Sequence, residues 1–328
     1  MPQDTHTSRP QQPEIFSTID KPVRSQTRPN TVDPMRVHFS KTWLAGGAIA
    51  GAAGIAALIR YGKPVLWGGI AFGAAALGHM ILGEPQRPVL ERIDLPIANL
   101  PPALEGLRIG QLSDLHLGQP FTANNLRWAV EQLHREQPDL IVLTGDQVMR
   151  HHAIPQLSEI LRGVHAPLGV YAITGNHDYW EGVRDIEAAL ALCGIPLLIN
   201  QNRQLTWRGQ EFWLVGVDDV WDGHLDYAAA ISGIPDGAFK ILLGHAPDIA
   251  DEAATYGFAL QLAGHVHGGH IRLPLIGPFV RPRFGVRYLD GIYQVGQMAL
   301  YVSRGLGGTP LRLLCPPEAT ILTLQRAA

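Results

Sequence analysis

The sequence predicts an α/β domain that follows an N-terminal membrane hairpin. From Pro88 onward, short apolar runs rich in β-branched residues alternate with amphipathic stretches, which is the pattern of an α/β domain. Two uncharged runs of 17 residues, Trp43 to Ile59 and Leu66 to Leu82, precede that domain and reach the lower limit for a bilayer span. Overall, 46% of the residues are hydrophobic and 17% are charged, which excludes a disordered chain.

The first 83 residues divide into a tail and a hairpin. Residues 1–40 are rich in Pro, Gln, Ser and Thr without an apolar period, so we expect a disordered tail. Residues 41–83 are expected to form a two-helix membrane hairpin, because the charged, helix-stopping residues 60–64 separate the two apolar runs. A cleaved signal sequence or a buried core hairpin is the alternative, but the apolar segment starts late and runs long for a signal peptide.

The charges predict an orientation for this hairpin and exclude one class of partner. Lys and Arg residues flank its outer ends, and only Arg60 and Lys63 lie between the runs, so both ends are expected on the cytoplasmic side of the inner (plasma) membrane. A single span would instead place the C-terminal domain outside. The net charge of −3, from 26 Lys+Arg and 29 Asp+Glu, lacks the cationic excess of a nucleic-acid binder. No obligate protein partner is evident.

Residues 84–328 are expected to form one domain with nine strands and at least two helices. The stretch Thr122 to Glu136 places its apolar residues on one face, and the stretch Val183 to Cys193 is ended by Gly194, so both are expected to be helical. The predicted strands are Val89 to Leu95, Leu107 to Leu112, Leu140 to Thr144, Val170 to Thr174, Phe212 to Val217, Lys240 to Leu243, Phe258 to Ala263, Leu300 to Ser303 and Thr320 to Leu324.

Five of these strands end in an apolar run, one small residue and then a residue able to bind a metal ion. Open α/β sheets bind ligands beyond the carboxyl ends of their strands, so these five residues are expected in one crevice. Two of them have a histidine at spacing two, on the same side of an extended chain. The resulting set is Asp114, His116, Asp146, Asn176, His245, His265 and His267.

This set predicts two divalent metal ions. It contains only nitrogen and oxygen donors, and it is larger than one tetrahedral ion can use. Two ions of the Mn, Fe or Zn type that share a carboxylate fit it better. Taken singly, each residue has an ordinary structural explanation, such as a helix cap, a turn or a buried core histidine. Their joint occurrence at five strand ends favours the metal site.

The ordered motifs Asp114-Leu-His116, Gly145-Asp146, Gly175-Asn176-His177-Asp178, Gly244-His245 and Gly264-His265-Val-His267 resemble the signature of the calcineurin-like metallophosphoesterases. The closing stretch from residue 300 to residue 318 is similar to the bacterial membrane-associated branch. The resemblance implies a β-sandwich flanked by helices. It also implies that Asp114, His116 and His267 hold one metal ion and that Asn176, His245 and His265 hold the other, with Asp146 bridging both. His177 would then be a catalytic residue that faces the substrate, with Asp178 orienting it.

These observations predict a membrane-tethered hydrolase of phosphodiester or pyrophosphate bonds in a phospholipid or lipid-linked nucleotide. A metal-bridging hydroxide would attack in line, and His177 would assist the leaving group. Hydrolysis of UDP-2,3-diacylglucosamine is the most specific version, and it rests on the resemblance. The alternatives are an outward-facing phosphoesterase of cell-wall or nucleotide substrates and a non-catalytic metal-binding scaffold.

The segment from Ile271 to Tyr288 follows the last predicted ligand and combines arginines with apolar residues. We expect it beside the active site near the bilayer surface, with the arginines binding phosphate and the apolar residues contacting acyl chains. The alternative is a surface loop with solvated arginines. The candidate substrate residues are Arg272, Arg281, Arg283 and Arg287.

Overall fold

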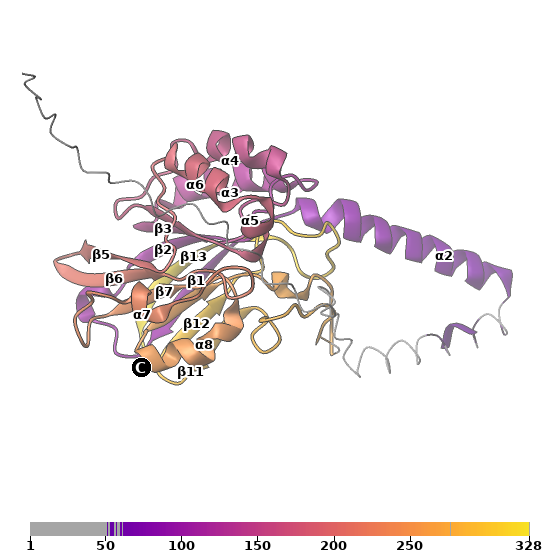
Figure 1. Cartoon of the computed structure of the whole chain (residues 1–328). Coiled ribbons are helices and arrows are strands. Elements are labelled where there is room, and N and C mark those ends of the chain that lie inside the picture. Colours follow the sequence, from indigo (N-terminus) through magenta and orange to yellow (C-terminus); the bar gives the residue numbers. More distant parts are fainter. Residues whose placement is uncertain are drawn as a thin grey trace, which may run out of the picture. The chain divides into compact units, whose positions relative to one another are not determined.

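The computed structural model describes residues 51, 53–55, 57, 60, 62–275 and 277–327. Within these residues the chain forms two large β-sheets and a short two-stranded sheet (Figure 1). The first large sheet has the order β1 (Val89–Ile97), β13 (Glu318–Arg326), β2 (Arg108–Leu112), β3 (Leu140–Thr144) and β4 (Val170–Ile173). The second has the order β11 (Gly291–Val295), β12 (Met298–Val302), β8 (Leu260–Ala263), β7 (Lys240–Leu243), β6 (Gln210–Gly216) and β5 (Gln201–Trp207).

The two large sheets pack face to face and helices cover their outer faces. The central core joins Ile109 and Leu322 of the first sheet to Leu214 and Leu262 of the second. Outside the first sheet a second core contains residues of α3 (Thr122–Glu136), α4 (Ile154–Leu161) and α6 (Val183–Ala191). Outside the second sheet a third core contains residues of α7 (Tyr227–Ala230) and α8 (Ala250–Ala253). The domain is therefore a helix-flanked β-sandwich, as expected.

Strand direction decides where polar strand-end residues meet. In the first sheet β2, β3 and β4 run parallel, and in the second β6, β7, β8 and β12 run parallel. The carboxyl ends of parallel neighbours share one edge of their sheet, so residues that follow these strands gather at that edge. A short helix, α5 (Asn176–Glu181), begins there directly after β4.

All nine predicted strands are present, and their bounds agree with the predicted ones within two residues. The strands that the sequence did not predict are β5, β11 and the short β9 (Arg272–Leu273) and β10 (Gly277–Pro278). Strand β5 is a mostly exposed edge strand of largely polar residues, so it lacks the apolar run that marked the others.

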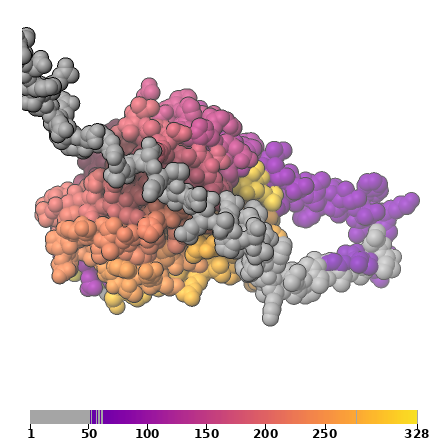
Figure 2. All heavy atoms as spheres, in the orientation of Figure 1, coloured from indigo at the N-terminus to yellow at the C-terminus, as the bar shows by residue number. Residues whose placement is uncertain are grey.

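The predicted membrane hairpin is described only in its second half. Helix α2 (Lys63–Gly78) continues through a π-helical turn (His79–Gly83) into a 3-10 turn (Glu84–Gln86). The helical segment Lys63–Gln86 is long and apolar enough to cross a membrane. None of the residues of α2 is buried, and Figure 2 draws the helix uncovered. The first predicted span, residues 43–59, lies mostly outside the described residues, as does the tail of residues 1–40.

Candidate metal centre

The carboxyl-end edge of the two sheets brings six predicted site residues into three overlapping groups, together with His177. Within each group the ligand atoms lie within 4.8 Å of one another. The groups are Asp114, His116 and His267; His116, Asp146 and His177; and Asp146, His245 and His265. His116 links the first two groups and Asp146 links the last two. The cluster is therefore continuous across both sheets.

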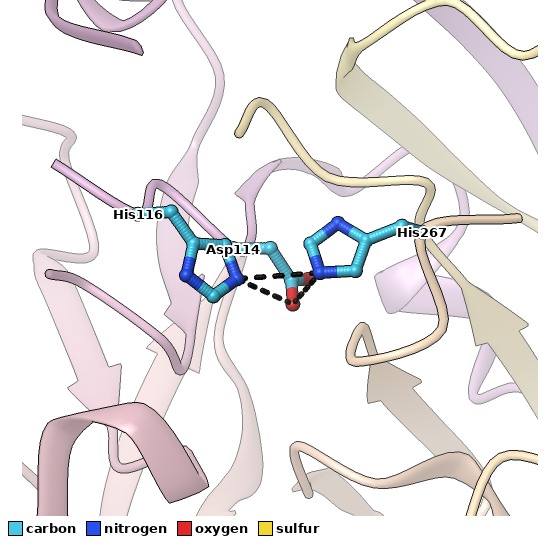
Figure 3. A group of neighbouring side chains, drawn as sticks. All are labelled: Asp114, His116 and His267. Carbon is cyan, nitrogen blue, oxygen red and sulfur yellow. Dashed lines mark hydrogen bonds and ion pairs between the residues drawn. The ribbon is translucent and has the colours of Figure 1, made fainter. Parts of the chain in front are cut away.

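The first group joins the loop after β2 to the loop after β8 (Figure 3). The Nε2 atoms of His116 and His267 lie 3.2 Å apart. Oδ1 of Asp114 is 3.5 Å from Nε2 of His267 and 3.9 Å from Nε2 of His116. The three side chains point toward one another in Figure 3, as ligands of a shared cation would.

The second and third groups share the Asp146 carboxylate. Its Oδ2 atom lies 3.4 Å from Nε2 of His116 and 3.3 Å from Nε2 of His245. Its Oδ1 atom accepts the main-chain N–H of His177 at 2.9 Å. Nδ1 of His245 is 2.7 Å from the carbonyl oxygen of Thr144, an arrangement that turns Nε2 toward the cluster. Asp146 thus lies between histidines of both groups, where a bridging ligand would stand.

Asn176 and Asp178 follow β4 and have different surroundings. The side chain of Asn176 is buried, and its Oδ1 atom has no hydrogen-bond partner among the described residues. A cation bound beside this buried carbonyl oxygen would give it a partner. The Asp178 carboxylate instead accepts main-chain N–H groups of Gln147, at 2.8 Å, and of Gly175, at 3.0 Å.

The hydrogen bonds of the Asp178 carboxylate are to the main chain, and its expected part in orienting His177 stays a prediction. Its hydrogen bonds hold the loop that carries Asp146 against the start of α5, so it positions the backbone on both sides of the cluster. Any effect on the ring of His177 is indirect, because the carboxylate bonds the main chain. Burial raises the pKa of Asp178 to about 7, and the nearby Asp146 charge adds to this.

Backbone strain is concentrated at the cluster. Five of the seven predicted ligands have left-handed φ angles between 46° and 73°, a region that costs non-glycine residues on the order of 1–3 kcal/mol each. They are Asp114, His116, Asp146, His265 and His267. The turn that follows each strand bends sharply at the ligand itself. Such strain persists where surrounding structure fixes it, and its clustering points to function.

The small residues that precede the ligands allow close approach. A Cβ atom at Gly175 would lie 2.2 Å from Oδ1 of Asp146, and one at Gly264 would lie 2.2 Å from Oδ2 of Asp114. Neither contact is compatible with a side chain. The small residue that recurs in the motifs is therefore a packing requirement of the cluster.

Burial and one ion pair set the protonation of the cluster. Burial holds the pKa of His116 and of His267 well below the usual value and lowers the pKa of His265 to about 4. These imidazoles are neutral, which is the form that binds metal. Burial also acts to lower the pKa of His245, but the Asp146 carboxylate raises it well above the usual value. A bound cation would take the place of the proton on His245.

Two of the four predicted substrate arginines are engaged elsewhere. Arg272 pairs with Asp290, and Arg287 pairs with Asp251. Arg283 lies closer to the cluster, because its carbonyl oxygen is 2.7 Å from Nε2 of His265. That contact leaves Nδ1 of His265 for a metal ion.

Aromatic rings that sequence reasoning missed stand beside the cluster. The ring of Trp180 lies 4.2 Å from the ring of His177. The indole Nε1 of Trp180 donates to the Asp222 carboxylate at 2.7 Å. The ring of Trp221 lies 5.9 Å from the ring of His265, and the Arg283 guanidinium is 5.8 Å from that indole. The residues next to Trp180 and Trp221 in the sequence form no motif that would have predicted a place beside the cluster.

Two further charged residues support the cluster and were also missed. The buried Arg312 guanidinium donates to main-chain carbonyls of Arg304, Gly307 and Cys315. It thereby holds the loop after β12, where Gly307 donates its N–H to the carbonyl oxygen of Asp114 at 2.7 Å. Glu84 accepts the N–H groups of residues 314 and 315. Its signal was present in the sequence, since it is the only acidic residue between positions 41 and 90.

Comparison with known proteins agrees with this geometry. Residues 107–269 match the family model described as calcineurin-like phosphoesterase. The metallophosphoesterase YkuE of Bacillus subtilis, described as uncharacterized, is 36% identical over 274 residues, which cover 77% of this chain and 94% of that protein. The phosphodiesterase YaeI of Escherichia coli is 32% identical over 65% of this chain and 80% of its own length.

A third relative carries a membrane description. The zebrafish (Danio rerio) protein named transmembrane protein with metallophosphoesterase domain is 31% identical over 75% of this chain, and the match spans 60% of that protein. With the groups of Asp and His side chains at the strand ends, the matches make the chain a metal-dependent phosphoester hydrolase. The chain belongs to the calcineurin-like metallophosphoesterase family.

Proposed function

We propose that the protein is a membrane-tethered hydrolase of phosphodiester or pyrophosphate bonds, with two divalent metal ions, acting on a phospholipid or a lipid-linked nucleotide. Hydrolysis of UDP-2,3-diacylglucosamine on the cytoplasmic face of the inner membrane is its most specific form. The observation that carries the proposal is the continuous cluster in which Asp146 and His116 join three groups of metal-ligand type.

The cluster divides naturally between two cations. Asp114, His116 and His267 would hold one of them. His245, His265 and the unpartnered Oδ1 of Asn176 would hold the other, and Asp146 would serve both. Cations bound there would bind phosphoryl oxygens, neutralise developing negative charge and make water a stronger nucleophile near neutral pH.

His177 is the residue proposed to assist the leaving group. Its main-chain N–H is tied to Asp146, and its ring packs edge-on against the rings of His116 and Trp180. Nδ1 of His177 has no hydrogen-bond partner among the described residues. Burial lowers the pKa of the His177 imidazole, so the ring must first take up a proton, and the imidazolium can then give that proton to the departing oxygen. Since His177 also lies within ligand distance of His116 and Asp146, metal content has to be measured together with turnover.

The lipid part of the proposal has two supports. The segment Lys63–Gln86 is apolar enough to cross a membrane, and none of the residues of its helix α2 is buried. A relative with the same domain is named a transmembrane protein. A membrane anchor concentrates the enzyme with an amphiphilic substrate in two dimensions, so a lipid phosphodiester or pyrophosphate suits it.

The test is a substrate panel for the full-length protein in lipid vesicles with Mn²⁺, Fe²⁺ or Zn²⁺. Bis(p-nitrophenyl) phosphate reports phosphodiesterase chemistry, and vesicle-borne phospholipid and UDP-2,3-diacylglucosamine report lipid substrates. We expect turnover of the soluble diester and faster turnover, per molecule of enzyme, of one lipid substrate. The Asp146→Ala variant is the control. No turnover of any diester with all three metals would contradict the proposal and favour a metal-binding scaffold.

Orientation separates the proposal from an outward-facing phosphoesterase. A reporter fused to the C-terminus, or protease added to intact and permeabilised spheroplasts, shows on which side the domain lies. The proposal requires a cytoplasmic C-terminus. Protection that is lost on permeabilising the membrane supports it, whereas cleavage in intact spheroplasts favours the outward-facing enzyme of cell-wall or nucleotide substrates.

A further inference from the structure

The small sheet beside the metal centre exposes apolar side chains. Strands β9 and β10 pair antiparallel, with Gly277 opposite Leu273. We call residues 271–275 and 277–280 the hairpin segment. Leu275, in its turn, is fully exposed to solvent, and Leu314 from the C-terminal part of the chain is 57% exposed. Together with Leu273 and Pro274 these side chains border an open hollow of about 530 Å³. Exposed leucines gathered at one place are a sign of a binding surface.

The same surface is joined through the backbone to the end of the apolar helix. The N–H of Arg272 donates to the carbonyl oxygen of Leu313 at 2.9 Å, so the hairpin segment is bonded to residues 311–315. On the other side of those residues, the N–H of Arg312 donates to the carbonyl oxygen of Met80 at 2.9 Å. The N–H of Leu314 donates to the Glu84 carboxylate at 2.8 Å. The hairpin segment and the helix end are therefore attached to opposite sides of one short stretch of chain.

This stretch also contacts the metal centre. The thiol of Cys315 donates to the carbonyl oxygen of His267 at 3.2 Å, and the N–H of Leu313 donates to the carbonyl oxygen of His270 at 3.0 Å. Residues 313–315 therefore connect the predicted ligand His267 to the helix end and to the exposed leucines. A surface that meets Leu275 and Leu314 would therefore lie close to the predicted ligand His267.

We propose that the hairpin segment and Leu314 insert into the lipid surface in which α2 is anchored and so hold the metal centre against the phospholipid headgroups. This inference rests on the proposed membrane attachment and extends it, because it assigns a second membrane contact and the direction the site faces. A bilayer is the occupant that fits. Helix α2, which leads into the helix end attached to this stretch of chain, is apolar and has no buried residue, and lipid covers such a helix. Inserted Leu side chains leave water as they do in a protein core.

The proposal has a chemical consequence for the substrate. A phosphodiester at headgroup depth would reach the cluster while its acyl chains stay in the bilayer. A soluble diester needs no such docking and reaches the same ligands from water. Loss of the docking contact should therefore slow turnover of the lipid and spare turnover of the soluble ester.

Depth-dependent quenching tests the contact directly. The full-length protein is reconstituted in vesicles of phosphatidylcholine and phosphatidylglycerol, and Leu275→Cys is labelled with an environment-sensitive fluorophore. Cys193→Ser removes the half-buried native thiol, and Cys315 is buried. Gln297→Cys is the matched control, because the turn between β11 and β12 lies at the edge of the sheet opposite the metal centre. Lipids with a doxyl group on the acyl chain should quench the label at position 275 and not the label at position 297.

Turnover is measured with the Leu275→Glu variant, because Leu275 is outside the proposed catalytic and metal-binding residues. We expect turnover of vesicle phospholipid to fall about tenfold, with turnover of bis(p-nitrophenyl) phosphate unchanged. Equal quenching at both labelled positions overturns the proposal, and so does an equal loss of turnover on both substrates. Either result would be expected if a protein partner covers the hairpin segment. Because quenching needs no turnover, the docking proposal can be judged even if the proposed lipid substrates fail.

Discussion

Replacing Gly264 by alanine should impair the metal centre while leaving the fold intact. The new Cβ would lie 1.9 Å from Oγ of Ser113 and 2.2 Å from Oδ2 of Asp114. Ordinary contacts of a Cβ atom begin at 3.4 Å, so the Asp114 carboxylate would have to move by about 1 Å. A misplacement of that size can cost about 100-fold in rate. The φ of Gly264 is not left-handed, so the steric contact is the cause.

The assay compares Gly264→Ala with the parent protein under saturating Mn²⁺. We expect kcat/KM for bis(p-nitrophenyl) phosphate to fall about 100-fold, and the bound metal per chain to fall with it, while circular dichroism is unchanged. Gly69→Ala in α2 is the matched control, because nothing lies within 4 Å of its added Cβ. Parent-like activity and metal content in Gly264→Ala would refute the assignment of Asp114 as a ligand.

Three further results are expected. The His177→Ala variant should lose about 10²- to 10⁴-fold in kcat and keep its bound metal, and the loss should shrink with a better leaving group; metal loss as large as the activity loss would make His177 a ligand. The Asp178→Ala variant should lower the free energy of unfolding by about 3 kcal/mol in urea melts, because two buried main-chain N–H groups lose their acceptor. An unchanged midpoint would count against its positioning role. Chelation should abolish diester hydrolysis and Mn²⁺ should restore it, whereas activity that survives exhaustive chelation is incompatible with a metal mechanism.

The residues of the cluster could be selected from the sequence because their signal is local. Each ligand follows a buried strand after one small residue, and strand direction alone then brings the strand ends together. Asp146 and His245 are about 100 positions apart, yet each is recognisable from its neighbours in the chain.

The features that the sequence did not predict depend on tertiary contacts. The Asp178 side chain could have faced His177 or the main chain, and only the packing of the loop after β3 against α5 decides for the main chain. Arg312 is an ordinary arginine in the sequence, and its burial among carbonyl groups comes from the path of the loop after β12. The exposed edge strand β5 lacks an apolar run. Glu84 is conspicuous as the single acidic residue of an apolar segment, but the sequence did not indicate that it binds the main chain of residues 314 and 315.

The central claim is that Asp146 lies between two metal ions held by strand-end residues of both sheets. A crystal structure of the full-length protein soaked with Mn²⁺, with anomalous difference maps, tests it most directly. The account predicts two anomalous peaks about 3.5–4 Å apart, one beside Asp114, His116 and His267 and one beside Asn176, His245 and His265, with the Asp146 carboxylate between them. A single peak, or two peaks that Asp146 does not join, would contradict it.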